Sequence, residues 1–369
     1  MQNQFEDIRK EPLITRKWNF TVQDSINYPK GILITGANSF IGVHIANELI
    51  KNYKGSIHLL VRANDYNSGL EKIANAFDQW HLPSFSAEKY NVHIGDVFKQ
   101  QFGLGITEFK EINKSVDTVI HLAMNPVYHL PYSYFKDNWL PELEKMISFC
   151  GNPENPKTLH YASSFNANFF TTDEDFLSLN LNAWQSGYAG FKWVVNKVLY
   201  NAFDKNLTGC IYDIPLVLGS VDKGLCPNNY SIWHILNIFL KTKLYFPFSF
   251  RIIPVDVLAQ VIIANILSKE PQSFIRPALP EAITEKQFAL KARLIGLKKS
   301  GMEDVKLIFP GKLRFDFMVP PNFYQLLEKV NSLKEFFPSN FNCNTFPSTK
   351  KVFNANLRRY ISDKPEIFK

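Results

Sequence analysis

The sequence has little cysteine, with only four in 369 residues. None of the four belongs to a CxxC pair, so the sequence indicates neither a zinc site nor a disulfide framework. A reducing, cytoplasmic setting is the simplest expectation. The cysteines are widely spaced along the chain: Cys150, Cys210, Cys226 and Cys343.

Long apolar runs are missing as well. No stretch approaches the roughly 18 residues that a membrane-spanning helix needs. The first residues, MQNQFEDIRKEPLITRKW, are polar and of mixed charge, which is typical neither of a signal peptide nor of an anchor. Although the formal net charge is +7, there is no Lys/Arg block of the kind that binds nucleic acid. We expect no membrane span and no nucleic-acid partner, and the charge would suit an anionic cofactor or an acidic protein.

What the sequence does contain is the composition of a globular protein, 46% hydrophobic and 20% charged. Its first half alternates short apolar runs with segments of helical periodicity, and no internal repeat is visible. This alternation predicts an α/β fold, a Rossmann-type doubly wound parallel sheet with helices on both faces. Strands are predicted over 31–35, 56–62, 91–96, 117–123 and 158–164, and helices from residue 40 and over 70–80 and 134–150.

A glycine-containing turn joins the first predicted strand to the first predicted helix. In GANSFIG, residues 36–42, one glycine permits a tight turn and the other lets helix and strand pack closely. The helix N-terminus would then bind the pyrophosphate of a dinucleotide. The middle glycine of the usual pattern is replaced by Ser39, which places a side chain where the phosphate favours bare backbone. The candidate cofactor contacts are Thr35, Gly36, Asn38, Ser39, Phe40, Ile41 and Gly42.

The end of the second predicted strand indicates which dinucleotide is bound. NAD enzymes place an acidic residue about 20 residues past the glycines, where it binds the ribose 2′-hydroxyl. Here the sequence reads Val61-Arg62-Ala63. An arginine can bind a 2′-phosphate that a carboxylate would repel, so Arg62 favours NADP(H). The alternative is that Arg62 is simply a solvated strand end.

A tyrosine and a lysine lie four residues apart in GYAGFKW, residues 187–193. On a helix, Tyr188 and Lys192 would share one face. They could be a chance surface pair, or a phenol whose pKa is lowered by a neighbouring ammonium so that it donates a proton near neutral pH.

Several stretches together resemble the thioester reductase domains, a branch of the extended short-chain dehydrogenase/reductases. These domains end nonribosomal peptide synthetases, carboxylic acid reductases and aminoadipate reductases. The matching stretches cover roughly residues 30 to 268: TGANSFIG, LLVRA, GDVFKQQFGL, VIHLAMNPVYHLPYSYFKDN, HYASS, GYAGFKW and IIPVDVLAQ.

The resemblance implies roles for particular residues. Ser164, or less favourably Ser163, would polarise the substrate carbonyl, Tyr188 would donate the proton, and Lys192 would bind the nicotinamide ribose. Hydrogen bonds from Ser164 and Tyr188 would stabilise the charge that develops on a carbonyl oxygen as it accepts hydride. Further cofactor contacts are implied at Asp96, Val97, His121, Ala123 and Asn138, and the PVD stretch at Pro254, Val255 and Asp256 would lie near the substrate.

The chain also departs from the family pattern. Phe191 stands where a serine is usual, Asn196 where an acid is common, and Tyr212-Asp213-Ile214-Pro215 replaces Tyr-Arg-Pro-Gly. The sequence is compatible with three functions, of which the resemblance favours the first: reduction of a carrier-protein- or CoA-bound acyl or peptidyl thioester with NADPH, giving an aldehyde or an alcohol. The others are a nucleotide-sugar epimerase or dehydratase, and a non-catalytic dinucleotide-binding protein. The epimerase class predicts an acid in place of Arg62, and a decayed site predicts a missing Tyr or Lys.

The expected domain organisation has three parts. Residues 1–29 form an N-terminal extension, either a docking segment or a strap across the fold. Residues 30–270 form the NADP-binding domain, in which the aromatic segment 222–250 either borders the substrate pocket or packs in the core. Residues 271–369 form a smaller, mostly helical substrate lobe, because 281–297 and 321–337 have helical periodicity.

Overall fold

The computed structural model describes residues 28–124, 126–127, 130–170, 187–228, 251–279 and 346–363, with isolated positions elsewhere. Most of the aromatic segment 222–250 and both helical predictions of the C-terminal lobe therefore lie outside the described residues. In the described part of the chain, no helix combines the length and the apolar character needed to cross a bilayer.

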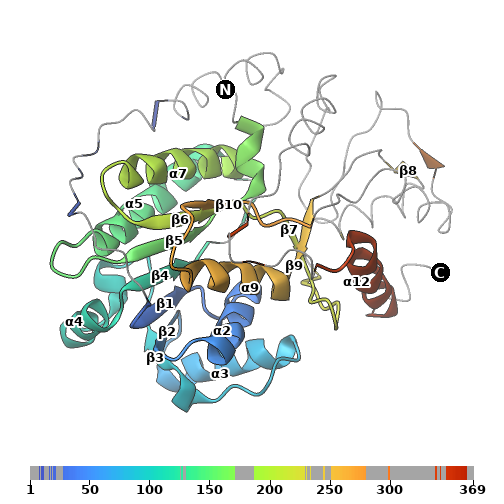
Figure 1. Cartoon of the computed structure of the whole chain (residues 1–369), viewed down its shortest axis with the longest axis horizontal. Helices are drawn as coiled ribbons and strands as arrows, with labels where there is room; N and C mark the ends of the chain where they lie inside the picture. Colours follow the sequence, from blue (N-terminus) through green and yellow to red (C-terminus); the bar gives the residue numbers. More distant parts are fainter. Residues whose placement is uncertain are drawn as a thin grey trace.

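The centre of the molecule is a parallel sheet of seven strands (Figure 1). Each strand is short, and the strands at the centre of the sheet are almost wholly buried, as expected where helices cover both faces. The predicted Rossmann-type fold is confirmed. In spatial order the strands are β3 (Asn91–Ile94), β2 (Ser56–Val61), β1 (Gly31–Thr35), β4 (Thr118–His121), β5 (Thr158–Ala162), β6 (Gly209–Tyr212) and β10 (Phe274–Ile275).

The sheet extends past residue 270, where we placed the boundary between the two lobes. Phe274 pairs with Ile211 and Ile275 with Tyr212, so β10 is the strand next to β6. The chain reverses direction across the sheet at β1, which has β2 on one side and β4 on the other. In open α/β sheets this switch point is where ligands bind, beyond the carboxyl ends of the strands.

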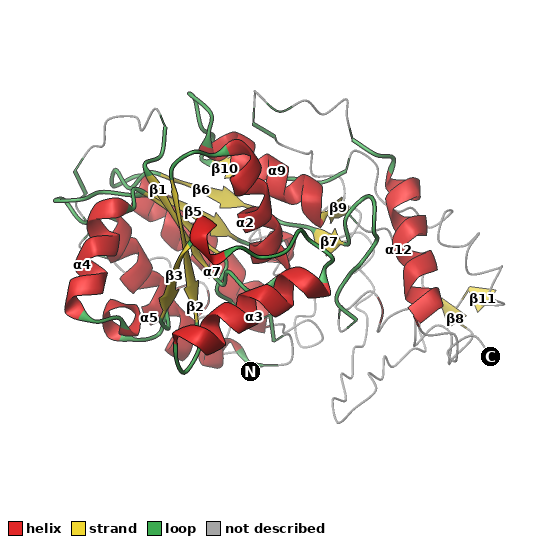
Figure 2. Cartoon of the chain, turned by 90° about the horizontal axis from the view of Figure 1, so that it is seen from below, coloured by secondary structure: helices red, strands yellow, loops and turns green. Residues whose placement is uncertain are grey.

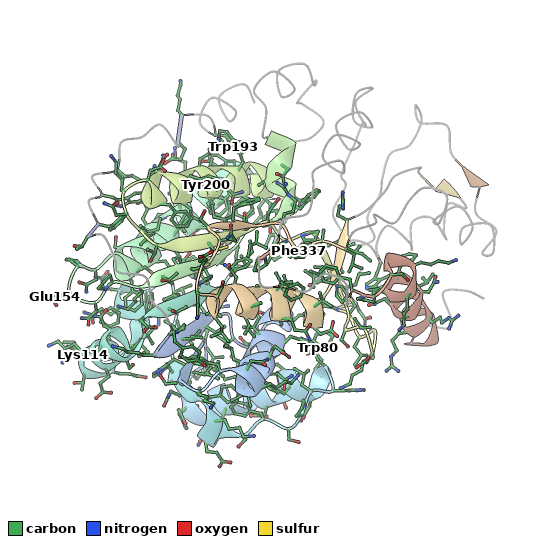
Figure 3. The ribbon with its side chains drawn as sticks, viewed as in Figure 1. Trp80, Lys114, Glu154, Trp193, Tyr200 and Phe337 are labelled. Atoms are coloured by element: carbon green, nitrogen blue, oxygen red, sulfur yellow. The ribbon has the colours of Figure 1, made fainter. Side chains whose placement is uncertain are left out.

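Two helical layers cover the sheet (Figures 1 and 2). Each layer has its own apolar cluster against one face. In the first layer Trp80 packs on Phe40, with their ring centroids 4.6 Å apart (Figure 3). That layer contains α2 (Phe40–Asn52), α3 (Tyr66–Gln79) and α9 (Val255–Ile266), and the opposite layer contains α4 (Ile106–Ser115), α5 (Tyr132–Cys150) and α7 (Gly187–Phe203).

Three further described elements, β7 (Leu216–Leu218), β9 (Ile252–Pro254) and α12 (Thr349–Asp363), lie beside the main sheet (Figure 1), and β8 (Leu244–Tyr245) pairs with β11 (Lys298–Lys299) in a separate sheet. β7 pairs in parallel with β9, and α12 lies next to β7. The buried Asn356 of α12 accepts a hydrogen bond from the Gly219 backbone N–H at 2.8 Å. Helix α12 and the helix α4 were not among the elements predicted from the sequence.

The described N-terminal residues lie along α5 and α7. Ile8 is buried and packs on Gly190 of α7, where an added Cβ would come within 2.8 Å of the isoleucine Cδ1. Arg16 Nε donates to Glu144 of α5 at 2.7 Å, and its other nitrogens bind Glu11. Of the two alternatives for the first 29 residues, these contacts favour a strap across the fold.

Candidate active site

The glycine turn between β1 and α2 has the geometry that its sequence predicts. Gly36 has φ +67°, a conformation that favours glycine, and a Cβ there would lie 3.0 Å from backbone atoms of Leu122 and Ala123. Gly42 approaches the Gly36 carbonyl so closely that a side chain would clash with it. The turn therefore places the N-terminus of α2 at the switch point between β1 and β4. The first turn of α2 contains no acidic residue, so no carboxylate there would repel a phosphate.

Ser39 is the N-cap of α2. Its Oγ accepts a hydrogen bond from the Gly42 backbone N–H at 3.0 Å, which satisfies one of the donors left free at a helix start. The serine side chain is thus turned toward its own helix, and this departure from the glycine pattern serves a capping role. Thr35 is fully buried behind the turn, Asn38 is exposed, and the half-buried Ile41 follows Phe40 in the first turn.

The end of β2 carries two positive charges. Arg62 is exposed directly after the strand, and Lys72 of α3 donates a hydrogen bond to the Arg62 carbonyl at 2.8 Å. Lys72 was not singled out from the sequence, because only the packing of α3 beside β2 reveals that its ammonium reaches this strand end. The only acid in the loop that follows, Asp65, is bound to Ser68 as the cap of α3.

Asp96 and Val97 follow β3 beside the same strand end. The Gly95 N–H donates to the Val61 carbonyl at 3.0 Å, which holds the loop after β3 against β2. One Asp96 oxygen accepts from the Phe98 N–H at 3.1 Å, and Val97 is buried. Asp96 and Val97 thus belong to a loop that is held against the end of β2, the strand that Arg62 follows.

Ser164 and Ser163 differ in what they contact. Ser163 is buried, and its hydroxyl donates to Asn196 of α7 at 2.5 Å. Ser164 is only half-buried, and its Oγ accepts a single described hydrogen bond, from the Asn166 N–H at 3.3 Å. The hydroxyl proton of Ser164 is therefore available to a ligand, whereas that of Ser163 is engaged. The geometry favours Ser164 over Ser163 as a donor.

Tyr188 and Lys192 lie on one buried face of α7. Tyr188 is 7% exposed, and the Lys192 Nζ is 5.9 Å from the centroid of its ring. The ammonium donates to the Tyr161 hydroxyl at 3.2 Å and to the Ala162 carbonyl at 3.0 Å, both on β5. Burial lowers the pKa of Lys192 to about 7, and the nearby Glu142 charge counteracts that shift. The pair is not a chance surface pair.

Two of the residues implied as cofactor contacts, His121 and Asn138, are not placed as residues lining an open channel would be. His121, at the end of β4, is 2% exposed, with Nδ1 2.9 Å from Thr35 Oγ1 and Nε2 3.4 Å from Glu142 Oε2. Asn138 is exposed on α5, and its amide donates to the Tyr134 carbonyl of the same helix. Ala123, in contrast, lies half-buried against Gly36. The structure therefore does not bring Asn138 into contact with the Tyr188 pair.

The other departures from the family pattern also have structural explanations. Phe191 is 1% exposed and stacks on Phe135 at 5.5 Å, so it is part of the core between α5 and α7. Asp213, after β6, accepts from Arg276 Nε at 2.7 Å and from Asn168 at 2.8 Å. The family pattern has an arginine at the end of β6, where this chain has Asp213. Here the guanidinium at that strand end belongs instead to Arg276, the residue after β10.

The PVD stretch joins β9 to α9. Pro254 is the last residue of β9 and the cap of the helix, and Val255 is buried in the core. The Asp256 carboxylate accepts from the Val221 N–H at 3.0 Å. It thereby fixes the loop after β7 to the start of α9.

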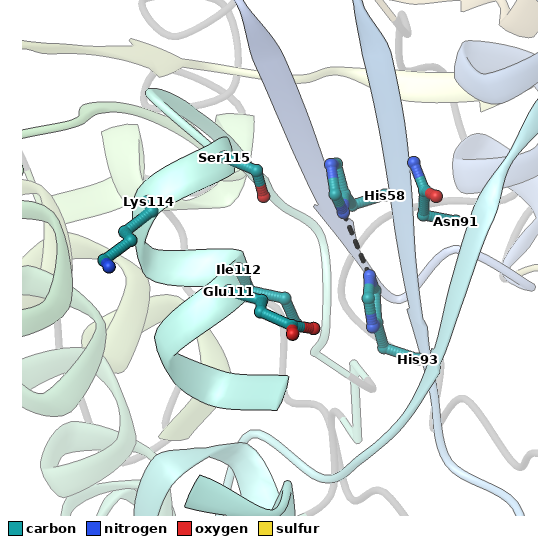
Figure 4. A pocket seen from close by; sticks show the side chains of 7 residues that line it. All are labelled: His58, Asn91, His93, Glu111, Ile112, Lys114 and Ser115. Atoms are coloured by element: carbon teal, nitrogen blue, oxygen red, sulfur yellow. Dashed lines mark hydrogen bonds between the residues drawn. The ribbon is translucent and has the colours of Figure 1, made fainter. Parts of the chain in front are cut away.

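A pocket of about 470 Å³ lies elsewhere, between β2, β3 and α4 (Figure 4). His58 Nδ1 is 3.0 Å from His93 Nε2, and His93 in turn contacts Glu108 at 2.8 Å. Asn91, the first residue of β3, and Ser115, the last of α4, place it toward the amino ends of the strands. It is thus separate from the residues at the carboxyl ends. No cluster of three metal-ligating side chains was found among the described residues.

The fold and the turn geometry define the class first: a dinucleotide-binding protein of the extended short-chain dehydrogenase/reductase type. Residues 34–262 match the NAD-binding family described as male sterility protein, and the chain belongs to that family. The family resemblance seen in the sequence is confirmed by the relatives.

Similar proteins include the L-2-aminoadipate reductase large subunit of Eremothecium gossypii, 26% identical over 53% of this chain and 16% of the relative. The nonribosomal peptide synthetase asaC of Aspergillus flavus is 26% identical over 69% of this chain and 27% of its own length. The chain thus spans a small part of these curated relatives. Among solved structures, the terminal R domain from the myxalamid PKS-NRPS pathway superposes with a TM-score of 0.73 at 16% identity, covering 97% of both chains.

Proposed function

We propose that this protein is an NADPH-dependent reductase that converts an acyl or peptidyl thioester to an aldehyde and a free thiol. The observation that carries the proposal is the position of Ser164, Tyr188 and Lys192. Ser164 follows β5, and Lys192 of α7 donates to the Ala162 carbonyl at the end of that strand, one helical turn from Tyr188. The Gly36 turn follows β1, which is joined to β5 through β4. A hydroxyl, a phenol and an ammonium thus lie near the same ends of the strands as the glycine turn.

The described residues fit the cofactor. The Gly36 turn and the N-terminus of α2 would hold the pyrophosphate, because the two glycines let the turn pack against the surrounding backbone and the helix start offers backbone N–H groups to an anion. Arg62 and Lys72 would hold the 2′-phosphate, Asp96 and Val97 would border the adenine, and Lys192 would contact the nicotinamide ribose. When bound, NADPH supplies the hydride.

The residues of the chain supply binding and proton transfer. Ser164 donates a hydrogen bond to the thioester carbonyl oxygen, and Tyr188 gives that oxygen its proton as the carbon accepts hydride. The resulting hemithioacetal breaks its carbon–sulfur bond, and the oxygen's proton passes to the departing sulfur. The products are an aldehyde and a thiol, and a second hydride and proton would convert the aldehyde to an alcohol.

The substrate class follows from the same proposal. A thioester carried on the phosphopantetheine arm of a separate carrier protein, or on CoA, would bring its carbonyl to the carboxyl ends of the strands. Carrier proteins tend to be acidic, and the net charge of +7 would attract them. The two charges beside β2 argue against the epimerase class, which binds the ribose hydroxyl with an acid.

The test is a direct assay of the purified protein with NADPH and a small panel of acyl-CoA and acyl-pantetheine thioesters. Loss of the reduced-nicotinamide absorbance, together with a trapped aldehyde in equal amount, is the expected result. NADPH oxidation with neither aldehyde nor alcohol formed, or no oxidation even with an acylated carrier protein, would contradict the proposal.

The proposed 2′-phosphate contact gives a prediction on cofactor choice. Replacing Arg62 with Glu is expected to weaken NADPH binding about 10- to 100-fold, because a charged hydrogen bond is lost and repulsion is added. Binding of NADH, which lacks the phosphate, should change much less. Fluorescence titration of both cofactors measures the ratio, and Arg358→Glu on the exposed face of α12 is the matched control. An unchanged ratio of the two dissociation constants would assign the phosphate to other residues.

A further inference from the structure

Glu142 is a buried carboxylate that the proposed reaction does not use. It lies on α5 and is 3% exposed. Its Oε2 is 3.4 Å from His121 Nε2, while Oε1 has no hydrogen-bond partner among the described residues. Burying a carboxylate without full pairing is costly, so its position calls for a compensating interaction.

The hydrogen bonds around His121 bear on which of its two ring nitrogens carries the proton. Thr35 is fully buried, and its Oγ1 accepts from the Leu122 N–H at 3.2 Å. A hydrogen bond from this hydroxyl to His121 Nδ1, 2.9 Å away, would satisfy its proton. In the tautomer that accepts this bond, the ring carries its proton on Nε2, the nitrogen that faces Glu142 Oε2. In that arrangement Glu142 faces a hydrogen-bond donor.

The Tyr161 ring lies between His121 and the proposed catalytic lysine, Lys192. The Tyr161 ring stacks on His121, with centroids 5.4 Å apart, and also lies 4.7 Å from the Lys192 ammonium. No carboxylate in the described part of the chain makes a direct ion pair with Lys192. The titratable groups that surround it are Tyr188 on its own helix, Tyr161 on β5, His121 on β4 and Glu142 on α5.

The electrostatics connect Glu142 to this lysine. Burial lowers the pKa of Lys192 to about 7, and the Glu142 charge opposes that shift. Burial likewise raises the pKa of Tyr161 well above its usual value, and the Glu142 charge adds to the rise. The carboxylate therefore favours an ammonium at Lys192 and a neutral phenol at Tyr161.

We propose that Glu142, oriented by His121, is the buried counter-charge that keeps Lys192 protonated beneath Tyr188. Glu142 is then a positioning residue: it touches neither substrate nor cofactor and acts through the lysine. Its catalytic consequence rests on the proposed function, because only a proton-donating Tyr188 needs the ammonium. The electrostatic pair itself does not depend on any reaction.

The first test measures Lys192 directly. In protein labelled with [15N]lysine, the Nζ resonance that disappears in Lys192→Arg is followed against pH. Glu142→Gln, which keeps the shape but removes the charge, is expected to lower the midpoint by about one pH unit. Glu144→Gln, the same change on the same helix at a residue paired with Arg16, should leave the midpoint unchanged. Circular dichroism and thermal unfolding verify that each variant is folded.

Glu142→Asp separates charge from packing. It keeps the carboxylate, so its midpoint should stay closer to that of the unmodified protein than the midpoint of Glu142→Gln does. An unchanged midpoint in Glu142→Gln, or an equal shift in the Asp and Gln variants, would overturn the proposal.

A pH–rate profile then tests the catalytic consequence. In Glu142→Gln the alkaline loss of kcat should begin at lower pH, with a rate near normal at the acidic end, where Lys192 is protonated in both proteins. A uniform loss at every pH would indicate a structural role and overturn the positioning role. A shifted Lys192 midpoint in a protein that reduces no thioester would support the counter-charge while contradicting the proposed reaction.

Discussion

Replacing Tyr188 with Phe is expected to lower the rate of NADPH-dependent thioester reduction by about 10²- to 10⁴-fold, the range that a general acid contributes. The change removes one oxygen from a buried side chain whose ring packs against Phe135, with centroids 6.0 Å apart. The packing of α7 on α5 should therefore persist. Single-turnover rates, with the NADPH dissociation constant measured separately, distinguish lost proton transfer from lost cofactor binding.

Tyr200→Phe is the matched control for this variant. Tyr200 lies on the same helix, is 38% exposed and is far along α7 from the first turn (Figure 3). Its replacement should leave both the rate and the dissociation constant as they are. A Tyr188→Phe protein with full activity would mean that another group donates the proton.

Replacing Arg276 with Met is expected to destabilise the fold by about 3 kcal/mol, the cost of leaving a buried charge without its partner. Asp213 is 1% exposed, and burial raises the pKa of its carboxyl while Arg276 and Asn168 oppose that shift. Asn168 also donates to the Phe165 carbonyl, in the turn that follows Ser164. Loss of the guanidinium should thus loosen this turn. Urea unfolding measures the free energy, and the KM for the thioester reports on Ser164.

A double variant identifies the cause of that loss. Adding Asp213→Asn to Arg276→Met removes the unpaired charge, so the double variant should be more stable than Arg276→Met alone. Arg358→Met, at an exposed position of α12, controls for the loss of an arginine. A double variant that is no more stable than the single one would assign the cost to the packing of Arg276 on Phe274, 5.2 Å from its ring.

Five of the seven strands of the main sheet could be predicted from local patterns, because apolar runs alternate with segments of helical periodicity in the first half of the chain, whereas β6 and β10 were not predicted. The runs at 31–35, 56–62 and 158–164 correspond to β1, β2 and β5 within two residues at each end. The glycine turn could also be predicted from the sequence, because the positive φ at Gly36 is a requirement of the local backbone. The role of Ser39 was not, because the direction of a single side chain decides between capping and obstruction.

Interactions between distant segments were not accessible to such patterns. Arg276 and Asp213 are 63 residues apart, and only the pairing of β10 with β6 brings them together. Glu142 and Glu144 are both acids in one predicted helix, yet the first is buried and the second is 42% exposed. Periodicity alone does not separate them, because a buried charge contradicts the apolar face that the pattern predicts.

The packing of Ile8 on α7 has a consequence for the order in which the protein folds. Ile8 precedes β1 in the chain, whereas Gly190, its contact on α7, follows β5. This contact can therefore form only after α7 has been made, when the residues of β1 to β5 have already been synthesised. Contacts between such distant parts of a chain close late and slow folding. The packing of α7 is thus completed only when a segment from much earlier in the chain returns to it.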